Sequence, residues 1–240
     1  AISLQQLSEI ESSTRGHRCG GALITYQHVL TTASCTFNND NGVFSPINHT
    51  KYRVFAGSVV LYNDTSDDRH RSIANITIHP MFDTSRPFNN DIAVITLASS
   101  FSEDVVVPVG MSISADDAIT SIISCTVAGW GAQNGSTSVS SKPFLSLLDA
   151  RQATSIGDGG NPLECLRHPI YPGRLMGLLT KTNDCTDSNN PEIYTRVNAY
   201  YGWVHQVINH IAPASTPGAA SALQPGLALF AILAYIQMYL

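Results

Sequence analysis

Few residues of this chain have the types and the spacing that chemistry requires. The sequence has 240 residues, with eight histidines and five cysteines. No histidine pair has metal-ligand spacing with cysteine or carboxylate, and no Cys-x-x-Cys pair occurs, so we expect neither a metal nor a cofactor. Asp158 lies in a glycine-rich run, residues 157–160, in which Gly159 offers no side chain for nucleophilic attack.

The glycine-rich run is one of several motifs that resemble the trypsin-like serine proteases. Residues 157–163, Gly-Asp-Gly-Gly-Asn-Pro-Leu, are similar to the Gly-Asp-Ser-Gly-Gly-Pro-Leu signature of that family. Residues 31–35, Thr-Thr-Ala-Ser-Cys, are similar to its Thr-Ala-Ala-His-Cys. Four more segments resemble the family in the same order: residues 19–24, 90–94, 125–131 and 194–197. The resemblance covers residues 18–211 and implies an all-β fold of two antiparallel barrels with the active cleft between them and a C-terminal helix.

The resemblance implies a catalytic triad of which one member remains. Asp91 stands at the aspartate position, Ser34 at the histidine position and Gly159 at the serine position. In that triad the serine attacks a carbonyl carbon, the histidine takes its proton and the aspartate orients the histidine. Because the imidazole and the nucleophilic hydroxyl are both missing, we expect peptide hydrolysis to fail.

Backbone donors do not depend on side chains. The N–H groups of Gly157 and Gly159 could therefore still form an oxyanion hole. In the family, the residue that matches Asp158 organises this loop by pairing with a freshly cut N-terminal ammonium, and no matching activation segment is found before Cys19. We expect Asp158 to lack that partner, with the hole collapsed as in a zymogen.

The positions that the resemblance assigns to substrate recognition are altered as well. Ala153 stands where trypsin has the residue that selects basic side chains. Thr180, Lys181 and Thr182 replace a substrate-docking Ser-Trp-Gly, and Glu192 replaces a glycine of the pocket wall. Since burying an unpaired glutamate is costly, we expect Glu192 to block the pocket or to turn toward water. Trypsin-like peptide recognition is not expected.

The resemblance also implies two disulfides and leaves one cysteine over. The implied pairs are Cys19 with Cys35 and Cys125 with Cys165. Each should stabilise the fold by about 3 to 4 kcal/mol if lost chain entropy in the unfolded state dominates. Cys185 is expected to be unpaired, as a free thiol or linked to another chain, because Ser155 occupies its partner position.

Short apolar segments between turn-rich stretches predict the strands that must position these residues. This pattern is typical of an antiparallel sandwich or barrel. The predicted strands are residues 22–25, 29–32, 52–56, 73–78, 92–97, 126–128, 175–180 and 192–197. Near the end, apolar residues repeat at helical spacing, which predicts a packing helix with Asn198 as its N-cap. They are Tyr200, Val204, Val207, Ile208 and Ile211.

The second half of the implied fold is short. Trp130 and Gly159 are only 29 positions apart. Active relatives have far more residues there, including a disulfide-closed loop. We therefore expect a truncated second barrel with part of its edge unpaired. The trypsin-like domain is assigned to residues 1–211, incomplete at its N-terminus and between residues 131 and 156.

Composition and N-glycosylation sequons indicate the location of the protein and the kinds of partner that it can have. At 43% hydrophobic residues it can bury one substantial core, and its net charge of −5 without a basic run gives no footprint for nucleic acid. The sequence has four sequons, and with paired cysteines they favour an extracellular, secreted or cell-surface protein. The candidate asparagines are Asn48, Asn63, Asn75 and Asn134. We expect only some to carry glycan, because Asn75 lies in a strand-like stretch.

The last residues change composition twice. Residues 212–225 are small and contain proline, which predicts a flexible spacer. Residues 226–240 are apolar apart from Gln237. As a helix they would extend about 22 Å, less than the ~30 Å hydrocarbon core of a membrane. We interpret them as a lipid-anchor signal, with a merely sticky tail as the alternative. Residues 1–11 have neither a basic residue nor a long apolar run, so no signal peptide is predicted there.

One functional hypothesis and two alternatives follow. The hypothesis is a catalytically inactive serine protease homologue that acts as an extracellular binding or regulatory module, its partner being a protease, an inhibitor or a substrate. The first alternative is a trypsin-like endopeptidase with residual activity or a displaced nucleophile, such as Ser155 with His28 or His168. The second is a truncated gene product without function.

Overall fold

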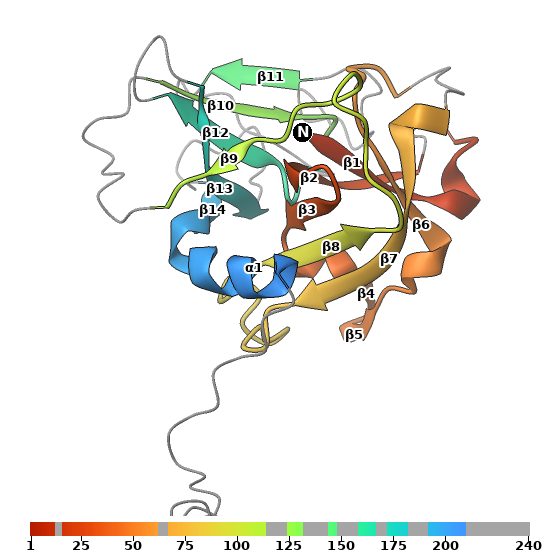
Figure 1. Ribbon diagram of the computed structural model, residues 1–240. Coiled ribbons are helices and arrows are strands. Elements are labelled where there is room, and N and C mark those ends of the chain that lie inside the picture. Colours follow the sequence, from red (N-terminus) through yellow and green to blue (C-terminus); the bar gives the residue numbers. More distant parts are fainter. Residues whose placement is uncertain are drawn as a thin grey trace, which may run out of the picture.

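The described part of the chain folds into two β units that lie side by side, with an α-helix across them (Figure 1). The computed structural model describes residues 1–12, 16–61, 67–113, 124–131, 144–147, 158–166, 172–181 and 192–209. For residues 144–147 and residue 181 it describes the backbone alone. The mostly β fold with a C-terminal helix expected from the sequence is confirmed.

The first unit is a closed barrel of six strands in the order β1-β2-β3-β8-β7-β6. Neighbouring strands are antiparallel throughout. The strands are β1 Ile2–Gln6, β2 His17–Thr25, β3 His28–Thr31, β6 Tyr52–Phe55, β7 His70–Ile78 and β8 Ala93–Leu97. Closure leaves the barrel without an unpaired edge, which favours a unit that is stable by itself.

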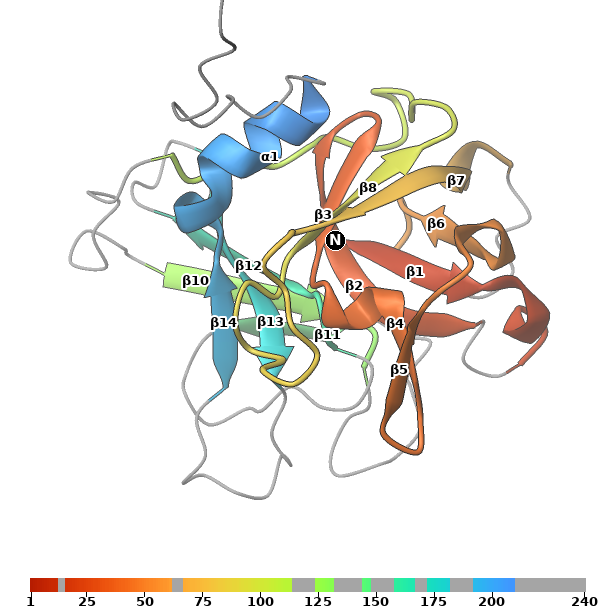
Figure 2. The same cartoon turned by 90° about the horizontal axis from the view of Figure 1, so that it is seen from below.

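A separate hairpin, β4 Phe37–Asp40 with β5 Val43–Pro46, projects from this barrel (Figure 2). Asn41 and Gly42 connect the two strands, and both have positive φ, 54° and 89°. Two-residue turns with positive φ at both positions match the twist of a hairpin, and Asn-Gly is their preferred sequence. This hairpin was not predicted, although the Asn-Gly pair in the sequence indicates it.

The second unit is a six-stranded sheet in the order β11-β10-β12-β13-β14, with β9 added parallel to β13. Its strands are β9 Gly110–Met111, β10 Ser124–Gly129, β11 Phe144–Leu147, β12 Pro162–Leu166, β13 Arg174–Lys181 and β14 Ile193–Arg196. Within the described ranges this sheet does not close into a barrel. An open sheet agrees with the shortening between Trp130 and Gly159.

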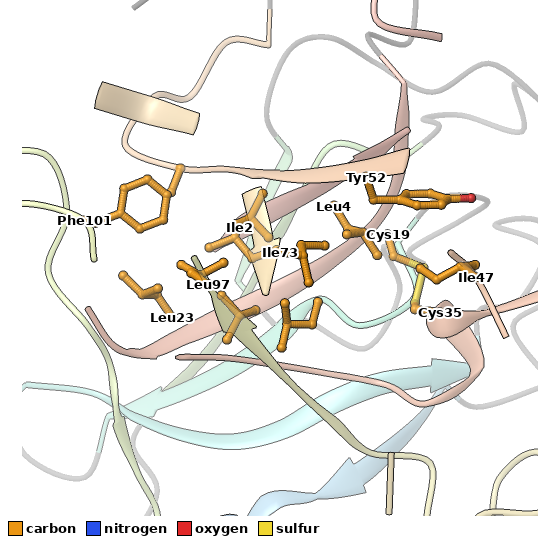
Figure 3. Packing of buried hydrophobic residues seen from close by; sticks show 14 residues of the cluster. Ile2, Leu4, Cys19, Leu23, Cys35, Ile47, Tyr52, Ile73, Leu97 and Phe101 are labelled. Atoms are coloured by element: carbon orange, nitrogen blue, oxygen red, sulfur yellow. A yellow bond between two sulfur atoms is a disulfide. The ribbon is translucent and has the colours of Figure 1, made fainter. Parts of the chain in front are cut away.

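Two large hydrophobic cores and a small cluster of Phe55, Leu61 and Trp130 hold the described part of the fold together. The core of the first barrel gathers Ile2, Leu4, Val54 and Leu97 beside the Cys19–Cys35 disulfide (Figure 3). A second core joins the two units, since it combines residues of the first barrel with residues of β13 and the helix. It contains Ala22, Leu30, Ile92, Val94, Leu175, Leu178, Val197 and Val204.

The helix lies where the apolar spacing predicted it, but it begins later. A 3-10 turn, η6 Val197–Tyr200, precedes α1 Tyr201–Ile208. The prediction that Asn198 is the N-cap is wrong: Asn198 lies inside the 3-10 turn, and the N-cap is Tyr200, which makes no side-chain cap. The cap position moved because the tighter turn continues directly from β14. Ile211 lies outside the described residues.

Each strand predicted from the sequence is confirmed, with boundaries shifted by a few residues. The strands missed besides the hairpin are β1, β9, β11 and β12, of which β9 has only two residues. None of the helices in the described ranges is both long and apolar enough to span a bilayer.

Candidate functional site

Asp91 is the centre of a buried hydrogen-bond network at the junction of the two units. It lies just before β8 and has none of its surface exposed (0%). Its Oδ1 accepts a hydrogen bond of 2.7 Å from the backbone N–H of Ser34. Its Oδ2 is 2.9 Å from the Ser34 hydroxyl and 3.1 Å from the Thr180 hydroxyl. The carboxyl group is thus held by Ser34 from the first barrel and by Thr180 from the second sheet.

Thr195 extends the network on the side of the second sheet. Its hydroxyl lies 2.7 Å from the Thr180 hydroxyl and 3.0 Å from the backbone carbonyl oxygen of Asp91. Thr180 belongs to β13 and Thr195 to β14. Hydroxyl groups of two neighbouring strands therefore bind both the side chain and the backbone of Asp91, which ties the two units together.

Burial raises the pKa of the Asp91 carboxyl above its ordinary value, and hydrogen bonds from Ser34, Thr180 and the Ala33 N–H lower it in part. Each of these partners is a hydroxyl or a backbone N–H. Neither kind of group is a general base at neutral pH. The network can position and neutralise a carboxyl group, but it has no member that could take a proton from a nucleophile.

Ser34 occupies its position because a disulfide fixes the turn that carries it. The 3-10 turn η2 Ser34–Thr36 follows β3, and Cys35 within it is bonded to Cys19 of β2. Both the N–H and the hydroxyl of Ser34 point at Asp91. Serine in this position can donate a hydrogen bond to the carboxyl, as a histidine could, but it lacks the basic nitrogen.

Gly159 leaves a gap that a side chain could fill. Its carbonyl oxygen accepts a hydrogen bond of 2.8 Å from the N–H of Gly20. A Cβ built on Gly159 would be 3.4 Å from Cys35 Sγ and 3.7 Å from Cys19 Sγ, which are ordinary contact distances. Within the described residues its N–H donates no hydrogen bond, and its part in an oxyanion hole stays a prediction. Gly157, the other half, lies outside them.

Asp158 accepts hydrogen bonds from other groups than the N-terminal ammonium that organises this loop in the family. It is buried, and its Oδ1 accepts hydrogen bonds of 2.9 Å from the Gly131 N–H and 2.6 Å from the Asn161 side-chain amide. Asn161 stands at a position that is glycine in the family signature. Its side-chain amide is thus a donor to Asp158 that comes from the same loop.

Asn161 is the residue of this site that the sequence analysis overlooked. Its side chain is fully buried; two glycines make room for it, and a third makes room for its partner Asp158. A Cβ on Gly20 would lie 1.7 Å from its Oδ1, one on Gly129 would lie 1.8 Å from its Nδ2, and one on Gly131 would lie 2.1 Å from the Asp158 carboxyl carbon. The departure from Gly-Gly to Gly-Asn in the signature was the signal that could have found it.

One protein-family model matches most of this chain. The model described as Trypsin matches residues 4–204, most of the chain. This chain belongs to the trypsin family. Among curated relatives, human chymotrypsin-like elastase family member 1 is 26% identical over 236 residues, covering 86% of this chain and 86% of that protein. Mouse chymotrypsin-C is 28% identical over 242 residues, covering 86% of this chain and 83% of that protein.

Solved structures share the fold at lower identity. Human heparin binding protein has a TM-score of 0.67 and 22% identity, covering 89% of this chain and 93% of that chain. A second structure, that of HBP at atomic resolution, has a TM-score of 0.65 and 23% identity. At such identities the likeness concerns the fold alone.

Glu192, a predicted wall of the specificity pocket in this trypsin-family chain, is neither unpaired nor fully exposed. Its carboxylate is half-buried and accepts a hydrogen bond of 2.5 Å from the Tyr194 hydroxyl. Burial and this carboxylate raise the pKa of Tyr194 well above its ordinary value. Thr180, another predicted pocket residue, bonds Asp91 instead. Ala153 and Thr182 lie outside the described residues, and of Lys181 only the backbone is described.

The structure contains both disulfides that the family resemblance implied, Cys19–Cys35 and Cys125–Cys165. The described ranges hold no cluster of three metal-ligating side chains. The remaining predicted positions lie outside those ranges and stay predictions: Cys185, Ser155, His168, Asn63, Asn134 and the tail from residue 212 onward.

A serine–histidine hydrogen bond does occur in this trypsin-family chain, away from the expected centre. Ser3 Oγ and His17 Nδ1 are 2.6 Å apart. Ser3 is 0% exposed and His17 6% exposed, so a polypeptide substrate has no access to the hydroxyl. His28 has its Nδ1 2.8 Å from the Thr25 hydroxyl.

Proposed function

We propose that this chain is a catalytically inactive member of the trypsin family that acts by binding another protein outside the cell. The observation that carries the proposal is the state of Asp91. Its carboxyl group is buried and bonded by Ser34 and Thr180, where a working triad needs it to orient an imidazole. Gly159 supplies no nucleophile.

Because the chain has the fold of a protease without a working catalytic triad, we consider binding of another protein as its activity. The closed first barrel, the core shared between the units and two disulfides support a chain that folds. The disulfides fit an extracellular protein, because they persist in oxidising compartments. A protease, a protease inhibitor or a protease substrate is the class of partner that we propose.

The displaced-nucleophile alternative receives little support from the described residues. Ser3 and His17 are buried together, and His28 is engaged by Thr25. Neither arrangement leaves an accessible hydroxyl beside a free imidazole, which nucleophilic catalysis by serine requires.

The purified chain should not react with a fluorophosphonate probe, which phosphonylates the activated serine of serine hydrolases. The physical reason is the absence of a base within reach of an activated hydroxyl. Labelling is measured by intact mass, with chymotrypsin as the positive control. Stoichiometric labelling of this chain would overturn the proposal.

Gly159→Ser alone should also remain unlabelled and should cleave no peptide substrate. The new side chain fits at ordinary contact distances, so a folded variant without activity reports the missing base rather than a distorted loop. General-base catalysis typically contributes about 10²–10⁴-fold in rate. The matched comparison is Ser34→His with Gly159→Ser, which restores both groups, and cleavage by Gly159→Ser alone would contradict the interpretation.

A further proposal concerns where the protein is located. We propose that it is attached to the cell surface through a lipid anchor, for which its C-terminal residues provide the signal. Residues 226–240 are apolar and follow a small-residue spacer. When the full chain is expressed, phosphatidylinositol-specific phospholipase C should release the protein, without the cleaved apolar tail, from the cell surface. Retention on the membrane after treatment, with release of a known anchored protein in the same sample, would count against the anchor.

A further inference from the structure

Two sequon asparagines of the first barrel, Asn48 and Asn75, lie on the protein surface. Both are exposed, which a bulky hydrophilic substituent requires. The chain also contains two disulfides, and their formation places it in the oxidising compartment through which secreted proteins pass. N-linked oligosaccharides are attached in that same pathway.

Asn48 holds its acceptor sequence in a defined local structure. It is the N-cap of the 3-10 turn η3 His49–Lys51, and its Oδ1 accepts hydrogen bonds of 3.1 Å from the Thr50 N–H and 2.8 Å from the Thr50 hydroxyl. These bonds use the oxygen of the side-chain amide and leave its nitrogen free. Because an oligosaccharide attaches to the nitrogen, glycosylation at Asn48 preserves the cap.

Asn75 lies in β7. A residue in a strand is not expected to carry an oligosaccharide, but the position of Asn75 permits one. Its side chain is exposed, at a point where the pairing of β7 with β8 shifts register. One hydrogen of its amide nitrogen serves the Thr77 hydroxyl at 3.2 Å. The amide has a second hydrogen, so replacing that hydrogen by a sugar breaks no contact of the barrel.

We propose that Asn48 and Asn75 both carry N-linked oligosaccharides. In the transfer step the side-chain amide nitrogen forms a bond to C1 of the first sugar of a lipid-diphosphate-linked oligosaccharide. The bond between that C1 and the diphosphate oxygen breaks, the amide nitrogen loses one proton, and the lipid diphosphate leaves. No oxidation or reduction takes place. This inference is independent of whether the chain is catalytically inactive.

The two sites belong to one region of the barrel. The turn η3 that follows Asn48 packs against β7, the strand of Asn75, and against β6. Oligosaccharides at both positions therefore shield the outer surface around η3 and β7. They lie on neither β13 nor β14, the strands that bind Asp91 through Thr180 and Thr195.

Peptide-N-glycosidase digestion with peptide mass spectrometry tests the proposal. The full chain is expressed into the secretory pathway of mammalian cells, and the enzyme converts each glycosylated asparagine to aspartate. We expect conversion of most molecules at both positions. Since transfer precedes export, occupancy is scored on all molecules that have entered the pathway, exported or retained. Unconverted asparagine in most molecules at either position would overturn the proposal for that site.

Matched variants separate modification from folding. Asn48→Gln and Asn75→Gln should each remove one oligosaccharide from the intact mass. Thr50→Ser keeps the sequon and should leave the mass of the oligosaccharides unchanged, whereas Thr50→Val has a similar shape without the hydroxyl and should remove the one at Asn48. Asn89→Gln, at an exposed asparagine outside any sequon, should change nothing. Loss of an oligosaccharide from Thr50→Ser to the same extent as from Thr50→Val would contradict the assignment.

Discussion

Replacing Gly160 by alanine should destabilise this protein by about 3 kcal/mol or more, whereas the same replacement at the neighbouring Gly159 should cost less than about 1 kcal/mol. Gly160 has a φ of 80°, where a Cβ causes strain. Its Cβ would also lie 2.4 Å from the backbone oxygen of Gly20 and 2.5 Å from the Thr31 hydroxyl oxygen. A backbone atom cannot rotate away, so β2 and the loop must separate.

The strain of the positive φ and the clash of the Cβ with the backbone can be measured separately. Gly42 has a φ of 89° in the β4–β5 turn, and a Cβ there meets nothing within 4 Å. Gly42→Ala therefore reports conformational strain alone, about 1 to 2 kcal/mol. Urea unfolding followed by tryptophan fluorescence gives the free energies, because Trp130, which follows β10, is buried and Trp203 of α1 is partly buried. A loss for Gly160→Ala no larger than that for Gly42→Ala would contradict the predicted backbone clash.

Asp91→Ala should cost about 3 kcal/mol or more, while Asp91→Asn should keep most of the stability at neutral pH. Alanine leaves the Ser34 N–H, the Ser34 hydroxyl and the Thr180 hydroxyl without their shared acceptor. Asparagine keeps one oxygen for the Ser34 N–H and presents an amide N–H to the hydroxyls. Both variants are compared by urea unfolding.

The number of hydroxyl hydrogens around Asp91 explains why the side-chain amide of Asp91→Asn should fit the hydrogen-bond network. Thr180 and Thr195 have two hydroxyl hydrogens, but they take part in three oxygen–oxygen contacts: with each other, with Asp91 Oδ2 and with the Asp91 carbonyl oxygen. An ionised Asp91 leaves one contact without a hydrogen. A protonated Asp91 supplies it, because Oδ2–H then donates to Thr180, Thr180 to Thr195, and Thr195 to the carbonyl oxygen.

The pH dependence of stability follows from the direction of the pKa shift. The folded-state pKa of Asp91 is raised above its unfolded value of about 3.8 by burial. Its contribution is therefore fully present below that unfolded value and is lost as pH rises through the folded pKa. Relative to Asp91→Asn, the natural chain should become less stable between acidic and neutral pH. A difference that does not change with pH would contradict the shift.

Asp83 provides a control for which the change of stability with pH should have the opposite sign. Its carboxylate is exposed and accepts hydrogen bonds from the hydroxyl and the N–H of Ser85, which lower its pKa. A group with a lowered folded-state pKa contributes stability above its unfolded pKa and loses it as pH falls. The stability difference between the natural chain and Asp83→Asn should therefore change with pH in the direction opposite to that of Asp91→Asn.

The strands β7 and β8 could be predicted because a short apolar segment between turn-rich stretches is a local property of the sequence. The helix around Val204 could be predicted because its apolar residues repeat at helical spacing, which is local as well. The strand β9 could not be predicted in this way, because its two residues pair with β13 through a contact that is distant in the sequence. The N-cap was misplaced at Asn198 because side-chain preference alone does not show that a tighter turn continues from β14.

The absence of a nucleophile at Gly159 and of an imidazole at Ser34 was determined by the sequence alone, because a residue type decides which functional groups exist. What those positions do instead was decided by the tertiary structure. Ser34 and Asp91 meet within the first barrel, and the packing of the second sheet on that barrel brings the hydroxyls of Thr180 and Thr195 within hydrogen-bond distance of Asp91. The same packing buries Asn161 against Asp158. Burial and proximity arise from contacts across the fold, and therefore the role of a residue, unlike its chemistry, is a property of the folded chain.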